Sequence, residues 1–260
     1  MREFTEIKYK CEAGLARVTI NRPDRLNALG MNLAEEFNAL GEALAEEKQV
    51  RVVVLTGEGR AFSTGRDLKE SATHTKEDAD RYQLIGMDAV TKWEALPMPT
   101  IAAINGHTFG WGMEIALACD IRLVAEEATL CFPETALGVF PGAGGAVRLA
   151  RLIAPGVAKE LIYTSKRFDG IEAARIGFAN RAYPADSLVD EALALAAAIA
   201  ANGPLGVRGA KKVIEQTRNM AMAQGIAFSN AVRMPLNFTK DFAEALAAFK
   251  EKRKPEFRGE

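Results

Sequence analysis

The sequence predicts an α/β protein in which a core of alternating strands and helices is followed by a helical C-terminal region. Up to about residue 185, apolar runs that end in glycine alternate with segments of helical periodicity. Beyond about residue 157, most segments have a helical pattern. Of the 260 residues, 48% are hydrophobic and 26% are charged, which suits a globular chain with a full core. We therefore expect an α/β core over residues 1–200 and a helical region over residues 201–260.

The first half of the chain supplies the core elements in order. EIKYK and LARVTI are strand-like runs that predict a hairpin, with CEAG between them. From Leu33 to Leu44, apolar residues recur at steps of 4, 3 and 4, which is the spacing of one helical face. RVVVLTG is a β-branched strand, EGRAFSTGRDL is predicted to be a loop, and residues 78–96 are predicted to form the next helix.

The second half continues the alternation and then becomes helical. TIAAING is an apolar strand, GMEIALAC is a helix, and DIRLVAE and ATLCF are two further strands. PETALGVFPGAGG is predicted to be a loop that leads into the helix AVRLARLIA. Further helices are expected in GIEAARIG, SLVDEALALAAAIAANG and PLGVRGAKKVIEQTR, and a last one from about Asp241 to Arg253.

The composition argues against several classes of protein. A formal net charge of −1 gives no overall basic field, so we expect neither a nucleic-acid partner nor a membrane partner. No run reaches the ~18 apolar residues needed to span a bilayer, and MREFTEIKYK has no apolar signal region. Cys11, Cys119 and Cys131 fit neither a disulfide framework nor a metal site. We therefore expect a cytoplasmic protein without a bound metal.

Two glycine-containing loops follow two of the predicted strands. In VVVLTGEGRAFSTG and IAAINGHTFGWG, an apolar strand leads to a glycine and then to a loop with a phenylalanine and more glycine. If the strands are parallel, both loops emerge at the carboxyl edge of the sheet, where α/β proteins bind ligands. Backbone N–H groups of the two loops could then converge on one oxygen as an oxyanion hole. The plainer interpretation is that such glycines only mark turns.

Glu114 and Glu134 both lie in apolar surroundings. Glu114 is flanked by Met113 and Ile115 on a predicted helix, and Glu134 lies between TLCFP and TALGVF. Because a buried, unpaired carboxylate is costly, each is either a helix-terminal acid or a functional group. Burial and proximity would separate the pKa values of two such acids, so that one serves as acid and the other as base. PGAGG, residues 141–145, lacks the lysine of a P-loop and the spacing of a dinucleotide site.

Five ordered motifs make the chain resemble the crotonase (enoyl-CoA hydratase/isomerase) superfamily over essentially its whole length. They are NRPDRLNAL, VVVLTGEGRAFSTGRDL, PTIAAINGHTFGWGMEIALACDIRLV, PETALGVFPGAGGAVRL and FKEKRKPEF. The resemblance is closest to enoyl-CoA hydratase, which adds water reversibly and in syn geometry to a 2-enoyl-CoA thioester. It implies a spiral of ββα repeats, and C-terminal helices that serve assembly and close the coenzyme A pocket. It also implies a homotrimer or a dimer of trimers, with coenzyme A as part of the substrate and no separate cofactor.

The resemblance assigns roles to the two acids and the two loops. Backbone N–H groups of Ser63 and Trp111 would hold the thioester carbonyl and stabilise the enolate. Glu134 would supply the proton at C2, while Glu114 would orient the water and take its proton as it adds at C3. The N–H of Gly142 would lie beside that water.

The same resemblance implies a coenzyme A site built from several parts of the chain. The implied contacts are Arg25 and Leu26, then Gly65, Arg66 and Asp67, and finally Phe249 and Lys252 in the last helix. In the family, the last two positions often reach the nucleotide from a neighbouring subunit. By default, however, Lys252 is a solvated charge and Phe249 is part of a helix core. Arg66 replaces the small residue that is usual at its position, so its side chain could meet coenzyme A phosphates.

Trp111 departs from the family pattern, which usually has glycine at this position. The implied donor is the backbone, so tryptophan preserves it if φ is negative. The indole would then either wall the acyl pocket or pack at a subunit contact.

Three alternatives to a hydratase follow from the sequence. The first is a family isomerase or dehydratase that acts on an unusual acyl-CoA, and the second is a non-catalytic binding member such as an RNA-binding relative. Neutral net charge and the retained acids argue against the second. The third is a hydrolase with Ser63 as nucleophile and His107 as base, but the Gly-x-Ser-x-Gly motif is absent.

Overall fold

The N-terminal hairpin begins the fold of the computed structural model, which describes residues 3–260; the first two residues of the predicted core lie outside this range. Strand β1 (Ile7–Glu12) pairs antiparallel with β2 (Leu15–Ile20). The turn consists of Ala13 and Gly14, whose φ angles of 50° and 80° suit a two-residue hairpin. The predicted hairpin is confirmed, although the first half of the predicted CEAG linker belongs to β1.

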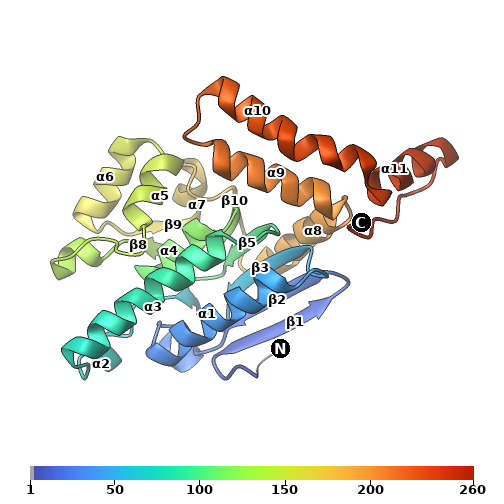
Figure 1. The fold of residues 1–260 in the computed structure, drawn as a ribbon. Helices are drawn as coiled ribbons and strands as arrows, with labels where there is room; N and C mark the ends of the chain where they lie inside the picture. The colour runs from blue at the N-terminus through green and yellow to red at the C-terminus, as the bar shows by residue number, and fades with distance from the viewer. Residues whose placement is uncertain (1–2) are drawn as a thin grey trace.

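A six-stranded sheet extends from this hairpin in the order β1-β2-β3-β5-β7-β10 (Figure 1). Its further strands are β3 (Val52–Gly57), β5 (Thr100–Ile104), β7 (Ile121–Ala125) and β10 (Arg181–Tyr183). From β2 onward, neighbouring strands run parallel. Every residue of β3 and β5 is buried, as expected for parallel strands covered on both faces, and α8 (Leu188–Ala200) covers one of these faces. The predicted α/β class is therefore confirmed.

A second, four-stranded sheet includes two segments that the sequence predicted as loops, together with the ATLCF run that it predicted as a strand. Its strands are β4 (Ala61–Ser63), β6 (His107–Phe109), β8 (Thr129–Cys131) and β9 (Phe168–Asp169). The prediction that EGRAFSTGRDL is only a loop is wrong for β4, and β6 was missed as well. Strands of three residues are too short to show a hydrophobic period. Three times, a strand of the large sheet is followed by a strand of the small sheet and then by a helix, which confirms the spiral of ββα repeats.

The helices of the core pack around the strands of these ββα repeats. α1 (Met31–Glu46) and α3 (Lys76–Glu94) pack together, and the predicted apolar face of α1 is buried. Thr75 and Asp78 form a capping box that fixes the start of α3. The shorter helical elements are η1 (Pro23–Arg25), α2 (Leu68–Ser71), α4 (Trp111–Ala118), η2 (Glu134–Leu137), α5 (Gly145–Leu152), α6 (Pro155–Thr164) and α7 (Gly170–Arg175).

The C-terminal helices lie over one side of the core, and α11 projects away from it (Figure 1). They are α9 (Pro204–Thr217), α10 (Met222–Arg233), η3 (Met234–Phe238) and α11 (Lys240–Glu251). The ammonium of Lys211 in α9 lies 2.8 Å from the Asp120 carboxylate, which ties this region to the core. No single helix in the described part of the chain is long and apolar enough to cross a membrane; α8 and α9 pass the test only as a pair bent by 105°.

Candidate active site

A cavity of about 510 Å³ opens between α3, α4 and η2. Both predicted acids, Glu114 and Glu134, line it. Its other walls combine apolar side chains with backbone from the two glycine loops, and they include Leu29, Gly65, Arg66, Leu68, Tyr82, Met87, Gly110, Trp111, Leu137, Val139, Phe140 and Gly142. The parallel strands thus bring together the segments that the sequence analysis singled out.

Glu114 is held inside the protein by the start of another helix. All residues of α4 are buried, and Glu114 is only 4% exposed. Its Oε1 accepts hydrogen bonds from the N–H of Ala143 at 2.7 Å and from the N–H of Gly145 at 2.9 Å. The PGAGG segment therefore orients this carboxylate directly. Gly142, predicted to contact the water, lines the cavity, whereas sequence reasoning missed the two donors to Glu114.

Glu134 lies at the start of η2 and has a different environment. Its Oε2 is buried and has no hydrogen-bond partner among residues 3–260. Gly110, with a φ of 50°, lies so close that a side chain there would place its Cβ 3.2 Å from Oε1 of Glu134. A carboxyl oxygen that faces a cavity without a partner is free to exchange a proton with a bound molecule.

The pKa values of both acids are raised by their surroundings. Burial, together with the nearby charge of Glu134, raises the pKa of Glu114 to about 7, although the hydrogen bonds from Gly145 and Ala143 oppose this rise. Burial also raises the pKa of Glu134. Two neighbouring carboxyl groups that resist ionisation can hold and pass protons near neutral pH, as acid–base catalysis requires.

The two glycine loops approach each other at van der Waals distance. A Cβ on Gly65 would lie 3.2 Å from the nitrogen of Trp111, and a Cβ on Gly112 would lie 2.1 Å from the oxygen of Ser63. The N–H of Trp111, at the first position of α4, donates no hydrogen bond within residues 3–260. A donor at a helix N-terminus beside two carboxyl groups suits binding of a carbonyl oxygen.

The indole of Trp111 packs inside its own subunit. Trp111 is 6% exposed, its ring lies edge-on to Phe37 at 5.2 Å, and its Nε1 donates to the carbonyl of Gly86 at 3.1 Å. Trp111 also lines the cavity, so its indole packs within its own chain beside the pocket. Its φ is not positive, so the departure from glycine leaves the backbone donor in place.

The predicted coenzyme A residues of the core lie near the cavity, but several of them contact one another. Arg25 binds Asp67 through two nitrogens, with the shortest distance 2.7 Å, and this guanidinium together with neighbouring donors holds the pKa of Asp67 below its usual range despite burial. The carbonyl of Leu26 accepts from the N–H of Thr64 at 3.2 Å. These contacts join the 22–30 segment to the loop after β4. The ion pair of Arg25 and Asp67 therefore holds these two segments of the site together.

Two predicted contacts lie elsewhere in the single chain. Phe249 is 86% exposed on α11, and Lys252 caps the end of that helix, so neither lines the cavity. The hydrolase alternative also finds no geometric support. The Ser63 hydroxyl donates to the carbonyl of Asn27 at 2.8 Å, and no hydrogen bond joins it to His107 within the described chain.

The long helix α3 contributes residues to the cavity that the sequence analysis did not select. Tyr82, Gln83, Gly86 and Met87 all line it. In the sequence they belong to an ordinary amphipathic helix, and no local motif distinguishes them. Only the packing of α3 against the loops brings them to the site.

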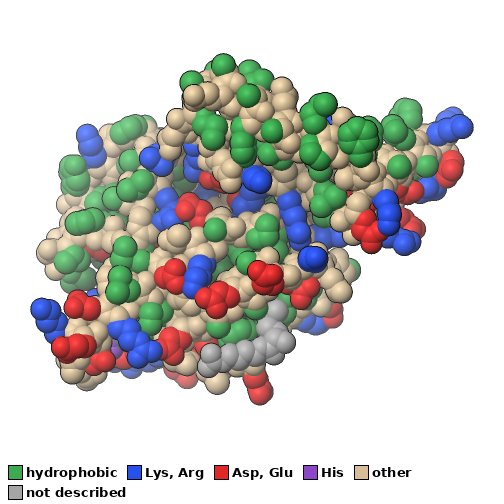
Figure 2. Space-filling view, in the orientation of Figure 1, with side chains coloured by type: hydrophobic (Ala, Val, Ile, Leu, Met, Phe, Trp, Pro, Cys, Tyr) green, Lys and Arg blue, Asp and Glu red, His purple; other side chains and the backbone are tan. Residues whose placement is uncertain are grey.

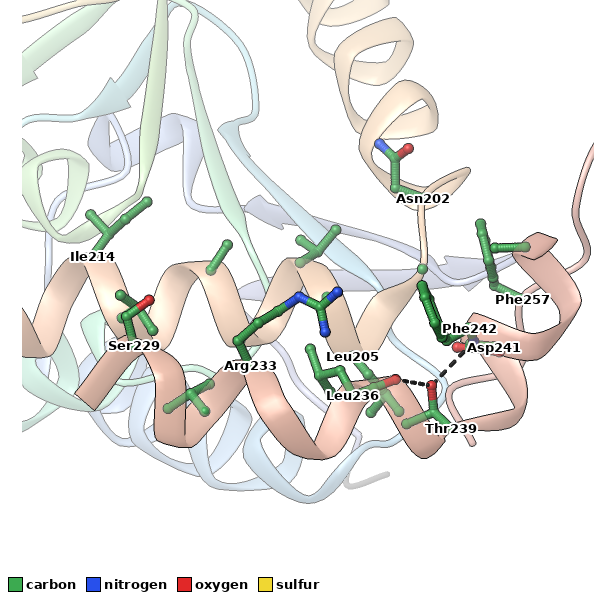
Figure 3. Close-up of a pocket in the computed structure, with 18 residues that line it drawn as sticks. Asn202, Leu205, Ile214, Ser229, Arg233, Leu236, Thr239, Asp241, Phe242 and Phe257 are labelled. Carbon is green, nitrogen blue, oxygen red and sulfur yellow. Dashed lines mark hydrogen bonds between the residues drawn. The ribbon is translucent and has the colours of Figure 1, made fainter. Parts of the chain in front are cut away.

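A second cavity, of about 640 Å³, lies between α9, α10 and α11 (Figure 3). Its lining is mostly apolar, and the carboxylate of Asp241 is already bound to the N–H groups of Arg258 at 2.7 Å and Gly259 at 2.9 Å. It therefore lacks the pair of free acids found in the first cavity. Over residues 3–260, no cluster of three or more His, Cys, Asp or Glu is arranged to hold a metal ion.

Comparisons with known proteins agree with this geometry. Residues 10–260 match the family model described as enoyl-CoA hydratase/isomerase. A Bacillus subtilis protein that carries the name of an enoyl-CoA hydratase/isomerase is 42% identical over 248 residues, covering 94% of this chain and 95% of that protein. The short-chain-enoyl-CoA hydratase of Clostridium acetobutylicum is 34% identical over 255 residues, covering 98% of each chain. The crystal structure of enoyl-CoA hydratase from Bacillus anthracis matches with a TM-score of 0.96 at 40% identity, covering 98% of this chain and 100% of that one.

Proposed function

Because the chain belongs to the enoyl-CoA hydratase/isomerase family, we propose that it adds water reversibly to the α,β-double bond of a 2-enoyl-CoA thioester. One observation carries this proposal. Glu114, which is buried, and Glu134, whose Oε2 is buried, have raised pKa values and line the same cavity as the N–H of Trp111, which donates no hydrogen bond within residues 3–260. Hydration needs such a set, since one group must take a proton from water, another must give one to carbon, and a donor must hold the carbonyl oxygen.

The residues divide the reaction as follows. The N–H of Trp111 binds the thioester oxygen where negative charge develops. Ser63, predicted as the second donor, is fully buried and does not line the cavity, so the step does not use it. Glu114, oriented by Ala143 and Gly145, takes a proton from water as the water oxygen bonds to C3. The electron pair of the double bond moves toward the carbonyl as an enolate, and Glu134 then donates its proton to C2.

The proton and electron balance of this step is complete without a redox change. Water supplies the hydroxyl group at C3 and a proton to Glu114, and Glu134 supplies the proton at C2. Return of one proton from Glu114 to Glu134 restores both acids, and the two carboxyl groups exchange roles in the reverse direction. We therefore propose that the enzyme uses no cofactor beyond the coenzyme A of its substrate. We also propose a reducing, cytoplasmic setting, supported by Cys119 and Cys131, which are buried as free thiols.

The test follows the absorbance of the conjugated enoyl-thioester, with mass spectrometry of the products. Hydration removes the absorbance and adds the mass of one water. Isomerisation removes the absorbance at constant mass, and hydrolysis releases free coenzyme A. Absence of hydration for all 2-enoyl-CoA substrates from C4 to C10 would contradict the proposal.

The exposed apolar side chains of the C-terminal region support a proposal of homo-oligomeric assembly. Met222 in α10 is 80% exposed and Phe238 in η3 is 88% exposed, and Figure 2 shows hydrophobic side chains gathered over this part of the surface. Patches of this kind mark interaction sites. We propose a trimer or a dimer of trimers, in which Phe249 and Lys252 reach the nucleotide of a neighbouring subunit. Light scattering after size-exclusion chromatography tests the assembly, and a monomer at working concentration would contradict it.

A further inference from the structure

Arg66 lines the candidate active-site cavity, but the proposed hydration step does not use its side chain. A guanidinium group offers five N–H donors. Within residues 3–260, only Nε is engaged by a hydrogen bond, to the hydroxyl of Ser71 at 2.6 Å. The two terminal nitrogens have no hydrogen-bond acceptor and no ion-pair partner in this part of the chain.

The neighbouring carboxylates are already occupied by other groups. Asp67 is bound by Arg25 at 2.7 Å and lies 3.5 Å from Arg22. Glu70 accepts from the N–H of Met31 at 2.7 Å through one oxygen, and its other oxygen lies 3.8 Å from Arg22. Within the described part of the chain, the positive charge of Arg66 is therefore not neutralised by direct contact with an acid.

The guanidinium is nevertheless held in one place. It lies 4.6 Å above the ring of Tyr82, a residue of α3 that is buried and fixed by a hydrogen bond from its hydroxyl to the carbonyl of Leu29 at 2.9 Å. The ring of Tyr82 and the hydroxyl of Ser71 thus position Arg66 without using the donors on its terminal nitrogens. A fixed, unpaired guanidinium at the wall of a cavity is suited to bind a carboxylate or phosphate through two parallel hydrogen bonds.

The direction of the side chain indicates which part of the substrate it meets. Asp67, the next residue, points toward Arg25 in the segment proposed to hold coenzyme A. Arg66 instead lies against α3, the helix whose Gly86 receives the hydrogen bond from the indole of Trp111. Arg66 and the pocket-wall indole therefore belong to the same side of the cavity.

From this arrangement we propose that Arg66 binds a carboxylate at the far end of the acyl group. The preferred substrates are then enoyl-CoA thioesters of dicarboxylic acids. The proposal rests on the proposed function for the reaction but concerns the acyl group alone. A neutral acyl chain would cover the guanidinium without supplying an acceptor, and burying an unpaired charged group in this way is unfavourable.

The experiment compares saturated thioesters that cannot be hydrated. Isothermal titration of the purified protein measures the Kd of glutaryl-CoA against valeryl-CoA, and of adipyl-CoA against hexanoyl-CoA. The wild type is expected to bind each dicarboxylic thioester about 10- to 100-fold more tightly than its neutral counterpart, a range typical of hydrogen bonds to charged groups. Arg66→Gln should reduce this ratio to near 1, and Arg66→Lys should give an intermediate ratio.

Arg17→Gln is the matched control, because Arg17 is an exposed arginine on β2, outside the cavity lining. It should keep the wild-type ratio. If Arg66→Gln weakens both members of a pair equally and the loss disappears with 3′-dephospho-coenzyme A thioesters, Arg66 binds a coenzyme A phosphate and the proposal is wrong. It is also wrong if the wild type shows no preference, or if the variant changes the melting temperature but not the ratio.

The outcome is separable from that of the proposed function. A wild-type protein that hydrates no 2-enoyl-CoA but still prefers the dicarboxylic thioesters would contradict the hydratase assignment and support the role of Arg66. Hydration of crotonyl-CoA, together with equal affinities for the two thioesters of each pair, would support the hydratase assignment and contradict the role of Arg66.

Discussion

The α/β core and the C-terminal helices use their apolar residues in opposite ways. In the core, every residue of β3, β5 and α4 is buried, and even Glu114 is enclosed. In the C-terminal region, α9 and α10 contain no buried residue, and large apolar side chains of α10, η3 and α11 face outward. Contacts within the chain therefore fix the positions of core atoms, whereas the C-terminal helices leave apolar surface exposed. Chemically matched substitutions should have much larger effects in the core.

The catalytic acids should show the largest contrast. Glu114→Gln and Glu134→Gln should each lower kcat by about 10² or more, since each removes a proton-transfer group. Glu215→Gln in α9 is the C-terminal counterpart and should stay within about twofold of the wild type, as expected for a surface site. Steady-state kinetics on a 2-enoyl-CoA provide the comparison. A near-wild-type rate in either cavity variant would remove that glutamate from the mechanism.

The burial of Glu114 should also appear in the pH dependence of stability. Its pKa is raised in the folded state from the ordinary value of 4.5 to about 7, so the folded protein holds this proton more tightly than the unfolded chain. The resulting stabilisation is complete below pH 4.5 and is lost as pH rises to 7 and above, by up to about 3 kcal/mol. Glu114→Gln lacks this loss, so its stability relative to the wild type should increase over this interval. Urea unfolding at a series of pH values measures the free energy of unfolding of both proteins. Parallel pH profiles of this free energy would contradict the expectation.

Two helical glycines allow a direct comparison of packing. A Cβ on Gly112 would lie 2.1 Å from the Ser63 oxygen, so Gly112→Ala should force β4 and α4 apart and destabilise the protein by about 1–3 kcal/mol. In α9, nothing lies within 4 Å of a Cβ on Gly206, so Gly206→Ala should stabilise the helix by up to about 1 kcal/mol. Thermal unfolding measures the change in melting temperature of each variant relative to the wild type. Equal shifts would mean that the two regions are packed alike.

Trp111→Phe should have a smaller effect than loss of either catalytic acid or the Gly112→Ala clash. Phenylalanine can keep an edge-on contact with Phe37, but it cannot donate to the carbonyl of Gly86, which costs about 1 kcal/mol. The smaller ring should also enlarge the cavity and favour longer acyl chains. The check is kcat/KM for 2-enoyl-CoA substrates from C4 to C10, relative to C4. An unchanged profile would place the indole outside the region that selects the acyl group.

Local sequence patterns predicted the long elements of this fold. The spacing from Leu33 to Leu44 defined the buried face of α1, and the β-branched run indicated the strand β3. The same approach missed β4 and β6, because their pairing depends on residues far apart in the chain, such as Ala61 with His107. It also missed Ala143 and Gly145 as the donors to Glu114, because a backbone N–H group leaves no residue-specific mark in a sequence.

The sequence by itself determined the α/β class, the two acids in apolar segments and the glycines that let two loops meet. These features are local, since periodicity and residue type follow from neighbours in the chain. Only the tertiary structure decided that Trp111 packs within its own subunit, that Arg25 pairs with Asp67, and that Arg66 lies over Tyr82 with no acidic partner among residues 3–260. The physical reason is that partnership and burial depend on groups brought together from distant segments, and the free energy of a charged or polar side chain depends on those groups.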